Sequence, residues 1–155
     1  MSYFFAQVNI ARMKFPLDHP QMADFVNNTS RINAIAEKSP GFLWRWNEEE
    51  GSSEAAEIFE DPNLVVNMSV WKSRDSLMEF TYHSDHMAIY KRKNEWFSKM
   101  EHMHMACWYT DKQGITLAEA KERLDYLHAH GETPYAFTFR SKYTPEEAQN
   151  YHHKH

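Results

Sequence analysis

The stretch "NLVVNMSVW" (residues 63–71) is the clearest β-strand signal in this sequence and decides how the rest is assigned. Its side chains form two alternating sets, which a strand places on opposite faces of a sheet. One set is wholly apolar, and the other includes polar groups: Leu64, Val66, Met68 and Val70 against Val65, Asn67, Ser69 and Trp71. The pattern predicts a strand with two chemically different faces.

A second strand is predicted just before it, in "FLWRWNEE" (42–49). Alternation places three aromatic residues on one face and two residues on the other: Phe42, Trp44 and Trp46 against Leu43 and Arg45. The connecting residues 48–63 are acidic, rich in small side chains and contain "DPN", so they predict mainly a solvated connection.

One helix and one strand are predicted before this pair of strands, and one helix and one strand after it. On the N-terminal side, Asp18 and Gln21 resemble a capping box before an amphipathic helix over 22–36, and "FFAQVNIARM" (4–13) alternates as a strand. On the C-terminal side, Ser73 caps a helix, and the signal Ser84-Asp85 predicts that this helix is kinked or in two parts. "MHMACWYT" (103–110) is the last core strand.

The order strand, helix, strand, strand, helix, strand predicts an α+β fold, the ferredoxin-like βαββαβ arrangement with a four-stranded antiparallel sheet. Its two helices cover only one face, so we expect the sheets of two copies to pack together in a homodimer. A single domain over 1–155 is expected, with a core over 1–112. The extension over 113–155 contains a capped helix at 116–131, a short edge strand at 135–139 and a frayed final turn.

Composition excludes several classes of function. The formal charge of -5 argues against a nucleic-acid or anionic-membrane partner. Cys107 is the single cysteine, which fits a reducing compartment, and neither a signal peptide nor an 18-residue apolar run is apparent, so a cytoplasmic location is expected. The sequence contains no phosphate-binding glycine loop, dinucleotide fingerprint or nucleophile elbow.

Four stretches resemble the uncharacterised DUF3291 family: "QVNIARMKFPLDHPQMADFV", "INAIAEKSPGFLWRW", "NMSVWKSRDSLMEFTYHSDHMAIYKRKNEWF" and "TLAEAKERLDYLHAHGETPYAFTF". The resemblance implies the dimeric α/β-barrel superfamily, which includes antibiotic-biosynthesis monooxygenases, haem-degrading enzymes, lyases and isomerases. The chain has "CWYTDKQGIT" where the family's last core strand usually ends in a Pro-Ala-Gly-His pattern. Of the three residues of the haem-degrading pattern, Asn9 matches, but Phe80 and Tyr90 replace the tryptophan and histidine.

His86 is the first candidate for chemistry. It follows the Ser84 cap, where the helix dipole disfavours imidazolium and leaves a neutral ring that accepts a proton or binds a metal. A partly buried histidine bonded to a backbone carbonyl is the structural alternative. His83 ends the preceding segment and is expected at the surface. A metal site would combine His83 or His86 with His104, which shares a strand face with His102.

Strand polar groups and aromatic residues complete the candidate site. Asn9 is expected to polarise a ligand, as such strand positions do in the superfamily. The expected substrate-binding residues are Asn67 and four aromatic side chains: Trp71, Phe80, Tyr90 and Trp96. The tryptophans also fit a structural role in the core.

Three functions remain open from the sequence. The first is an enzyme of the antibiotic-biosynthesis-monooxygenase type, an oxygenase, isomerase or lyase acting on a hydrophobic small molecule, with His86 and Asn9 as catalytic residues. The second is haem or metal binding through His86 with His83 or His104. The third is non-catalytic binding of a small ligand. The cofactor is expected to be either none or haem.

Overall fold

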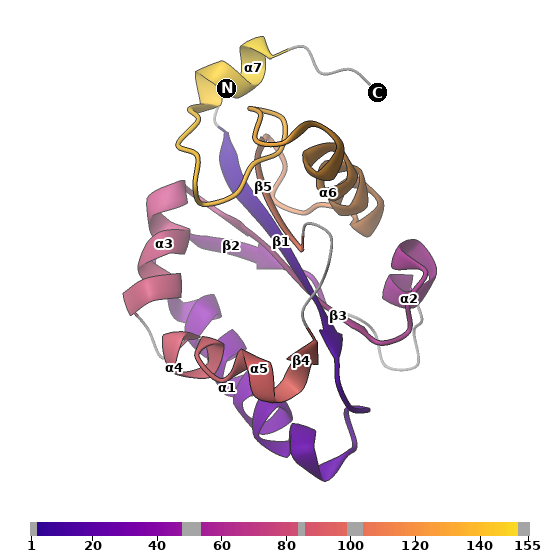
Figure 1. Ribbon diagram of the computed structural model, residues 1–155. Helices are drawn as coiled ribbons and strands as arrows, with labels where there is room; N and C mark the ends of the chain where they lie inside the picture. Colours follow the sequence, from indigo (N-terminus) through magenta and orange to yellow (C-terminus); the bar gives the residue numbers. More distant parts are fainter. Residues whose placement is uncertain (1–2, 48–53, 84–85, 99–103, 152–155) are drawn as a thin grey trace.

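The computed structural model describes residues 3–47, 54–83, 86–98 and 104–151 (Figure 1). Its sheet is built around β1 (Phe4–Met13). On one side of β1 lies β3 (Leu64–Trp71), followed by β2 (Phe42–Arg45), and on the other lie β5 (Met105–Thr110) and the two-residue β4 (Phe97–Ser98). All neighbouring strands are antiparallel. The mixed α+β fold is therefore confirmed.

Seven helices and one 3₁₀ turn are present in the described part of the chain. The turn is η1 (Pro20–Met22), and the helices are α1 (Ala23–Lys38), α2 (Glu54–Phe59), α3 (Arg74–His83), α4 (His86–Tyr90), α5 (Lys93–Trp96), α6 (Leu117–His130) and α7 (Pro145–Asn150). None of them is long and apolar enough to span a membrane. The order of the core elements, and the position of β1 between β3 and β5, match the ferredoxin-like arrangement.

One face of the sheet is covered by α1 and α3. Ala36 of α1 and Leu77 of α3 join a buried cluster with Phe5, Trp71 and Cys107 of the sheet. These strand residues belong to the set that alternation separates from Val8, Met68 and Val70. The face that carries Asn67 and Ser69 in the sequence pattern is therefore the one beneath the two core helices.

The opposite face is covered by α6 and α2 of the same chain (Figure 1). The α6 side chains Leu117, Leu124 and Leu127 are at most 4% exposed and pack in one cluster with Val8 and Trp108 of the sheet. The argument for a dimer rested on this face being open, and the extension over 113–155 removes that premise. The dimer itself stays a prediction.

Several local predictions were wrong for identifiable reasons. The β2–β3 register shifts between Phe42 and Trp44, so Phe42 lies opposite Trp71 while Trp44 lies opposite Val70, and the two aromatic residues face different layers. A short helix, α2, lies within residues 48–63, where a solvated connection was expected. His19, not Asp18, caps the N-terminal turn, since its Nδ1 accepts a hydrogen bond from the Gln21 N–H at 3.0 Å.

The predicted two-part helix is confirmed, since α3 ends at His83 and α4 begins at His86. Its second part differs from the expectation. It consists of α4 and α5 and then β4, where Phe97 pairs with Met13 instead of continuing a helix. The break at residues 84–85 lies outside the described residues. Residues 135–139 form no strand, but Phe137 makes one bridge to Cys107, with N–O distances of 2.6 and 3.0 Å.

The predicted caps of the extension are confirmed. Thr116 Oγ1 accepts a hydrogen bond from the Glu119 N–H at 3.1 Å, and Gly131 ends α6. The expected frayed turn is the short helix α7, whose start carries a complete capping box between Thr144 and Glu147. These local bonds define where each helix of the extension begins.

Gly41 tests how closely α3 approaches the turn before β2, and Gly131, at the end of α6, serves as the comparison. Both have positive φ, at 87° and 76°. A Cβ on Gly41 would lie 2.5 Å from the Ser76 Cβ of α3, whereas a Cβ on Gly131 would meet nothing within 4 Å. We expect Gly131→Ala to lower the free energy of unfolding by about 1–2 kcal/mol, from backbone strain alone. Gly41→Ala should cost more, because the collision is added.

Urea unfolding of the two variants measures this difference. Ser76→Gly removes the colliding atoms, so it should recover part of the loss in the Gly41→Ala background and none in the Gly131→Ala background. Equal losses for the two alanine variants would mean that α3 does not approach Gly41 as described.

Candidate functional site

A row of polar side chains crosses the sheet face beneath α1 and α3. The Gln7 amide Nε2 donates hydrogen bonds to Asn67 Oδ1 and to Ser69 Oγ, both at 2.8 Å. The β1–β3 register explains the contact, since Gln7 is paired with Ser69, and Asn9 is paired with Asn67. We call Gln7, Asn9, Asn67 and Ser69 the amide row.

Trp71 is joined to the amide row by its indole. Its Nε1–H donates to Ser69 Oγ at 2.9 Å, so the Ser69 oxygen accepts two hydrogen bonds. A hydroxyl has two lone pairs and one proton, which leaves the O–H group of Ser69 as a donor. Buried polar groups destabilise a fold unless they are bonded, and here the buried Gln7, Ser69 and Trp71 satisfy one another.

The amide row changes from buried to exposed along its length. Gln7 is 6% and Ser69 is 7% exposed, whereas Asn67 is exposed and Asn9 is half-buried. The row therefore connects the interior of this layer with solvent. It offers amide and hydroxyl donors in the middle of a sheet face that is otherwise lined by large apolar groups.

A series of aromatic rings leads from the amide row to His86. The ring centroids of Trp71 and Phe80 are 5.3 Å apart, those of Phe80 and His86 are 5.4 Å apart, and those of His86 and Tyr90 are 6.3 Å apart. We call Trp71, Phe80 and Tyr90 the aromatic wall. Four of the predicted site residues, His86 among them, are thus brought into one continuous group.

His86 begins α4, and its ring is partly buried. Its Nδ1 lies 3.3 Å from the Thr81 carbonyl oxygen, which can only accept, so Nδ1 carries the proton and Nε2 is the basic nitrogen of the neutral ring. Burial lowers the pKa of His86 from its ordinary value of 6.5, and the bond to Thr81 partly opposes this. The expected neutral ring is supported, but its main cause is burial instead of the helix dipole.

The other predicted histidines lie in different surroundings. His83 ends α3 and is exposed, as expected. His104 precedes β5, and its backbone oxygen accepts from the Ile10 N–H at 2.8 Å. Burial, followed by the positive charge of Lys93, lowers the pKa of His104. No group of three histidine, cysteine or acidic residues suited to a metal occurs among the residues that the structure describes, and His102 lies outside them.

Trp96 and Tyr90 take different roles from the rest of the predicted set. Trp96 is 1% exposed and packs against Phe25 of α1, with the Arg92 guanidinium 4.8 Å from its ring centroid, so it fastens α5 to α1. Tyr90 is 46% exposed and lies beneath the Lys93 ammonium, 4.2 Å from its ring centroid. Tyr90 therefore forms the solvent end of the aromatic wall.

Gln7 was missed as a site residue, although it links the amide row together. The signal was present in "FFAQVNIARM", where Gln7 and Asn9 stand two apart on one face of a strand that is otherwise mainly apolar. Cys107 pairs with Gln7 from the other side, and burial raises the pKa of its thiol, which fits an inert core residue.

Ser69 tests how the amide row is held together. Ser69→Ala leaves the Trp71 N–H and one N–H of Gln7 without their acceptor inside the protein, so we expect the free energy of unfolding to fall by about 1–3 kcal/mol. Asn67→Ala removes a bond at the exposed end, where water replaces it, and should cost less. Urea unfolding compares the two, and a larger loss for Asn67→Ala would contradict this order.

The lowered pKa of His86 predicts a pH dependence of stability. The unfolded chain binds the proton more readily than the folded chain, so the free energy of unfolding decreases as pH falls through and below 6.5. His104 acts with the same sign. The free energy of unfolding should therefore decrease less between pH 7.5 and 5.5 in His86→Gln than in the unmodified chain, although part of the decrease should remain. The control His83→Gln, at an exposed position, should show the same decrease as the unmodified chain. A His86 ring that titrates at or above 6.5 by NMR would overturn the assignment.

Comparison with known families accounts for nearly the whole chain. The family model described as "Domain of unknown function (DUF3291)" matches residues 4–154. A search of curated proteins found no match, and neither did a search of solved structures. The matched range includes β1, the amide row, His86 and the C-terminal extension, so the chain belongs to the DUF3291 family.

Proposed function

We propose that this protein is an enzyme that moves a proton on a small, largely apolar organic molecule containing a carbonyl group. The observation that carries the proposal is the amide row, in which Gln7 bonds Asn67 and Ser69 within an apolar layer and Asn67 is exposed to solvent. Titratable groups with a shifted pKa near convergent polar groups are typical of functional sites, and His86 supplies one between Phe80 and Tyr90 of the aromatic wall.

The division of roles follows from the chemistry of each group. Neutral His86 takes a proton from a carbon next to the carbonyl, and the electron pair of that C–H bond moves onto the carbonyl oxygen. Amide N–H groups of Asn67 and Asn9, together with the Ser69 O–H, stabilise the resulting enolate oxygen. Return of the proton to another atom of the enolate completes an isomerisation, so this step needs no oxidant.

The roles of His86 as general base and of the amide groups as oxyanion donors each imply a typical contribution to the reaction rate. A positioned general base typically contributes about 10²–10⁴-fold in rate. A single oxyanion donor typically contributes about 10²–10³-fold. The enolate is also the species from which a lyase or a cofactor-independent oxygenase would proceed, so the proposal includes the reaction types implied by the dimeric α/β-barrel resemblance. Trp71, Phe80 and Tyr90 would bind the apolar part of the substrate.

The homodimer is kept as part of the proposal with one restriction. Since α6 and α2 cover the sheet face that dimeric barrels would pair, a dimer of this chain would use another surface. The amide row and the aromatic wall are built from β1, β3, α3 and α4 of one chain, so the proposed site does not require a partner.

Deuterium exchange tests the proton transfer directly. Small cyclic ketones are incubated with the protein in D₂O, and loss of the C–H signal next to the carbonyl is followed by proton NMR. We expect exchange faster than in buffer, reduced about 100-fold or more in His86→Gln and also reduced in Asn67→Ala. His83→Gln, three residues away and exposed, is the matched control and should exchange at the unmodified rate.

Side-chain amide signals separate binding from catalysis. In ¹⁵N-labelled protein, a bound ketone should shift the side-chain NH₂ resonances of Asn67 and Asn9. Shifts without exchange would leave a ligand-binding protein and remove the enzymatic role. Exchange that persists at full rate in His86→Gln would remove His86 from the mechanism.

A further inference from the structure

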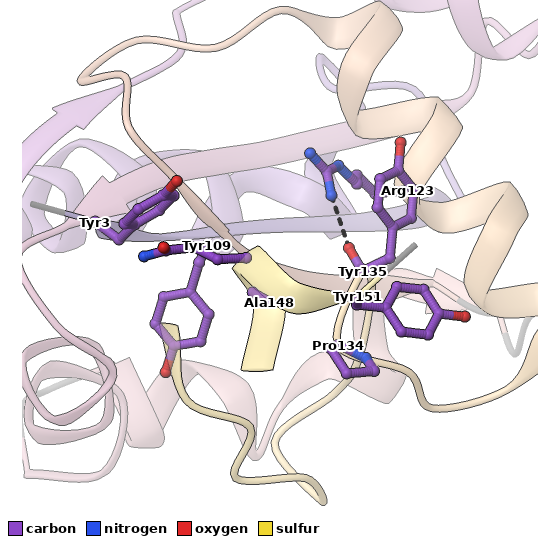
Figure 2. Close-up of a pocket in the computed structure, with 8 residues that line it drawn as sticks. Tyr3, Tyr109, Arg123, Pro134, Tyr135, Ala148 and Tyr151 are labelled. Atoms are coloured by element: carbon purple, nitrogen blue, oxygen red, sulfur yellow. Dashed lines mark hydrogen bonds between the residues drawn. The ribbon is translucent and has the colours of Figure 1, made fainter. Parts of the chain in front are cut away.

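A second site is formed where the C-terminal extension closes over one end of the sheet. A pocket of ≈ 280 Å³ lies there between Tyr3, β5, α6 and α7. Figure 2 shows the residues that line it. Its walls include Tyr3, Tyr109, Arg123, Tyr135, Ala148 and Tyr151. None of these residues belongs to the amide row or the aromatic wall. The volume lies just below the range for small-molecule sites, about 300–1,000 Å³, and so fits only a small ligand of about one ring.

The tyrosine side chains of this pocket are held in place by their hydroxyl groups. Tyr109 donates to the Tyr143 carbonyl oxygen at 2.8 Å, and Tyr135 donates to Glu122 Oε1 at 2.7 Å. The Tyr151 hydroxyl is bonded to that of Tyr126 at 2.8 Å. Because these polar ends are anchored, the rings form a fixed aromatic lining that offers apolar surface to a ligand.

Arg123 provides the strongest polar group in the lining. Its Nη1 donates to the Tyr135 carbonyl oxygen at 2.9 Å, the bond dashed in Figure 2, and its Nη2 donates to Glu119 at 3.2 Å. The guanidinium carbon lies 3.8 Å from the Tyr135 ring centroid. Nε is buried and has no hydrogen-bond partner among the residues that the structure describes. A guanidinium has five N–H groups, so this one keeps unused donors beside the pocket.

The charges around Arg123 indicate which ligand it suits. Glu119 pairs with its guanidinium, and Glu122 accepts from the neighbouring Tyr135 hydroxyl. Burial and this bond raise the pKa of Tyr135 to about 12, so its hydroxyl stays protonated. The cation is thus balanced by acidic neighbours, which disfavours an anionic ligand. The Tyr3 hydroxyl, which has no hydrogen-bond partner in the described part of the chain, adds a neutral donor.

We infer that the pocket lined by Tyr3, Tyr109, Arg123, Tyr135 and Tyr151 binds a small, uncharged, planar aromatic molecule through its ring and one carbonyl oxygen. The ring packs against the tyrosine lining, and the oxygen accepts from Arg123 and Tyr3. This site is separate from the proposed enzymatic site, and its ligand would bind without being transformed.

Benzamide is the probe, with benzoate as its anionic counterpart and cyclohexanecarboxamide as its non-planar one. Titrations of the ¹⁵N-labelled full chain should show benzamide shifting the backbone signals of Tyr109, Tyr135 and Ala148, with at least tenfold weaker binding of the other two compounds. Tighter binding of benzoate would overturn the uncharged class, and equal binding of cyclohexanecarboxamide would overturn the aromatic one. An absence of shifts at the pocket would overturn the site.

Variants are chosen so that folding and binding are distinguished. Ala148→Met fills the pocket from α7 without removing any of the tyrosine hydrogen bonds, and should weaken benzamide binding at least tenfold. Ala129→Met adds the same side chain at an exposed position of α6 and should leave binding unchanged. Benzamide that binds Ala148→Met as well as the unmodified chain would refute the proposal.

A second comparison separates this site from the enzymatic one. Asn67→Ala should leave the benzamide shifts at Tyr109 and Ala148 intact, because the amide row takes no part in them. Their loss in Asn67→Ala would assign the probe to the amide row and overturn the second site. Failure of ketone exchange with benzamide binding preserved would overturn only the enzymatic proposal.

Discussion

The register between β1 and β3 is the constraint on which the rest of the structure depends. It places Gln7 opposite Ser69 and Asn9 opposite Asn67, so that all four polar groups lie on the same face. Since strand side chains alternate, a slip of one residue would send the polar groups of one strand toward α6, where the sheet residues of the buried cluster are apolar. The hydrogen bonds of Gln7 therefore help to specify which face receives which helices.

The two layers that result have different compositions and different roles. Beneath α6 the sheet carries small and large apolar side chains that are almost completely buried, as Val8, Val70 and Trp108 show. Burial of this kind contributes stability in proportion to area and demands no special geometry. Beneath α1 and α3 the sheet carries bonded polar groups as well, and these require particular partners at particular distances. Both layers contain a buried apolar cluster, and chemistry is proposed only for the layer that also carries the polar groups.

The sequence predicted the elements whose signals are local. Alternation located β1, β3 and β5, and the Thr116 cap with Gly131 located α6, because strand period and helix capping depend on neighbouring residues alone. The register shift at Phe42 could not be predicted from the sequence, since the extra residue in β2 is defined only by its pairing with β3. The covering of the second face by α6 was also missed, because amphipathicity shows that a helix is buried but not what it is buried against.

The candidate site was predictable in part for the same reason. His86 and Asn67 stand out in the sequence by residue type and position, whereas the connection from Ser69 through Trp71 and Phe80 to His86 exists only when β3, α3 and α4 are assembled. The lowered pKa of His86 likewise arises from burial, which no single segment determines. Patterns along the chain identified members of the site, and only the packing showed how they are joined.

The C-terminal extension explains why one chain has room for a second binding site. Its residues 131–143 are fixed to the core by contacts with β5 and α3: the bridge of Phe137 to Cys107, the hydrogen bond from Arg74 to the Phe139 oxygen at 2.9 Å, and the hydrogen bond from Tyr109 to the Tyr143 oxygen. Phe5 contacts both Tyr109 and Phe137, so these three rings form a packed cluster at the end of the sheet. The tyrosine-lined pocket exists only when the extension is docked on this end of the sheet, whereas the amide row is complete within the ferredoxin-like core. An extension that first serves to cover an apolar sheet face therefore also creates a cavity that the core alone does not contain.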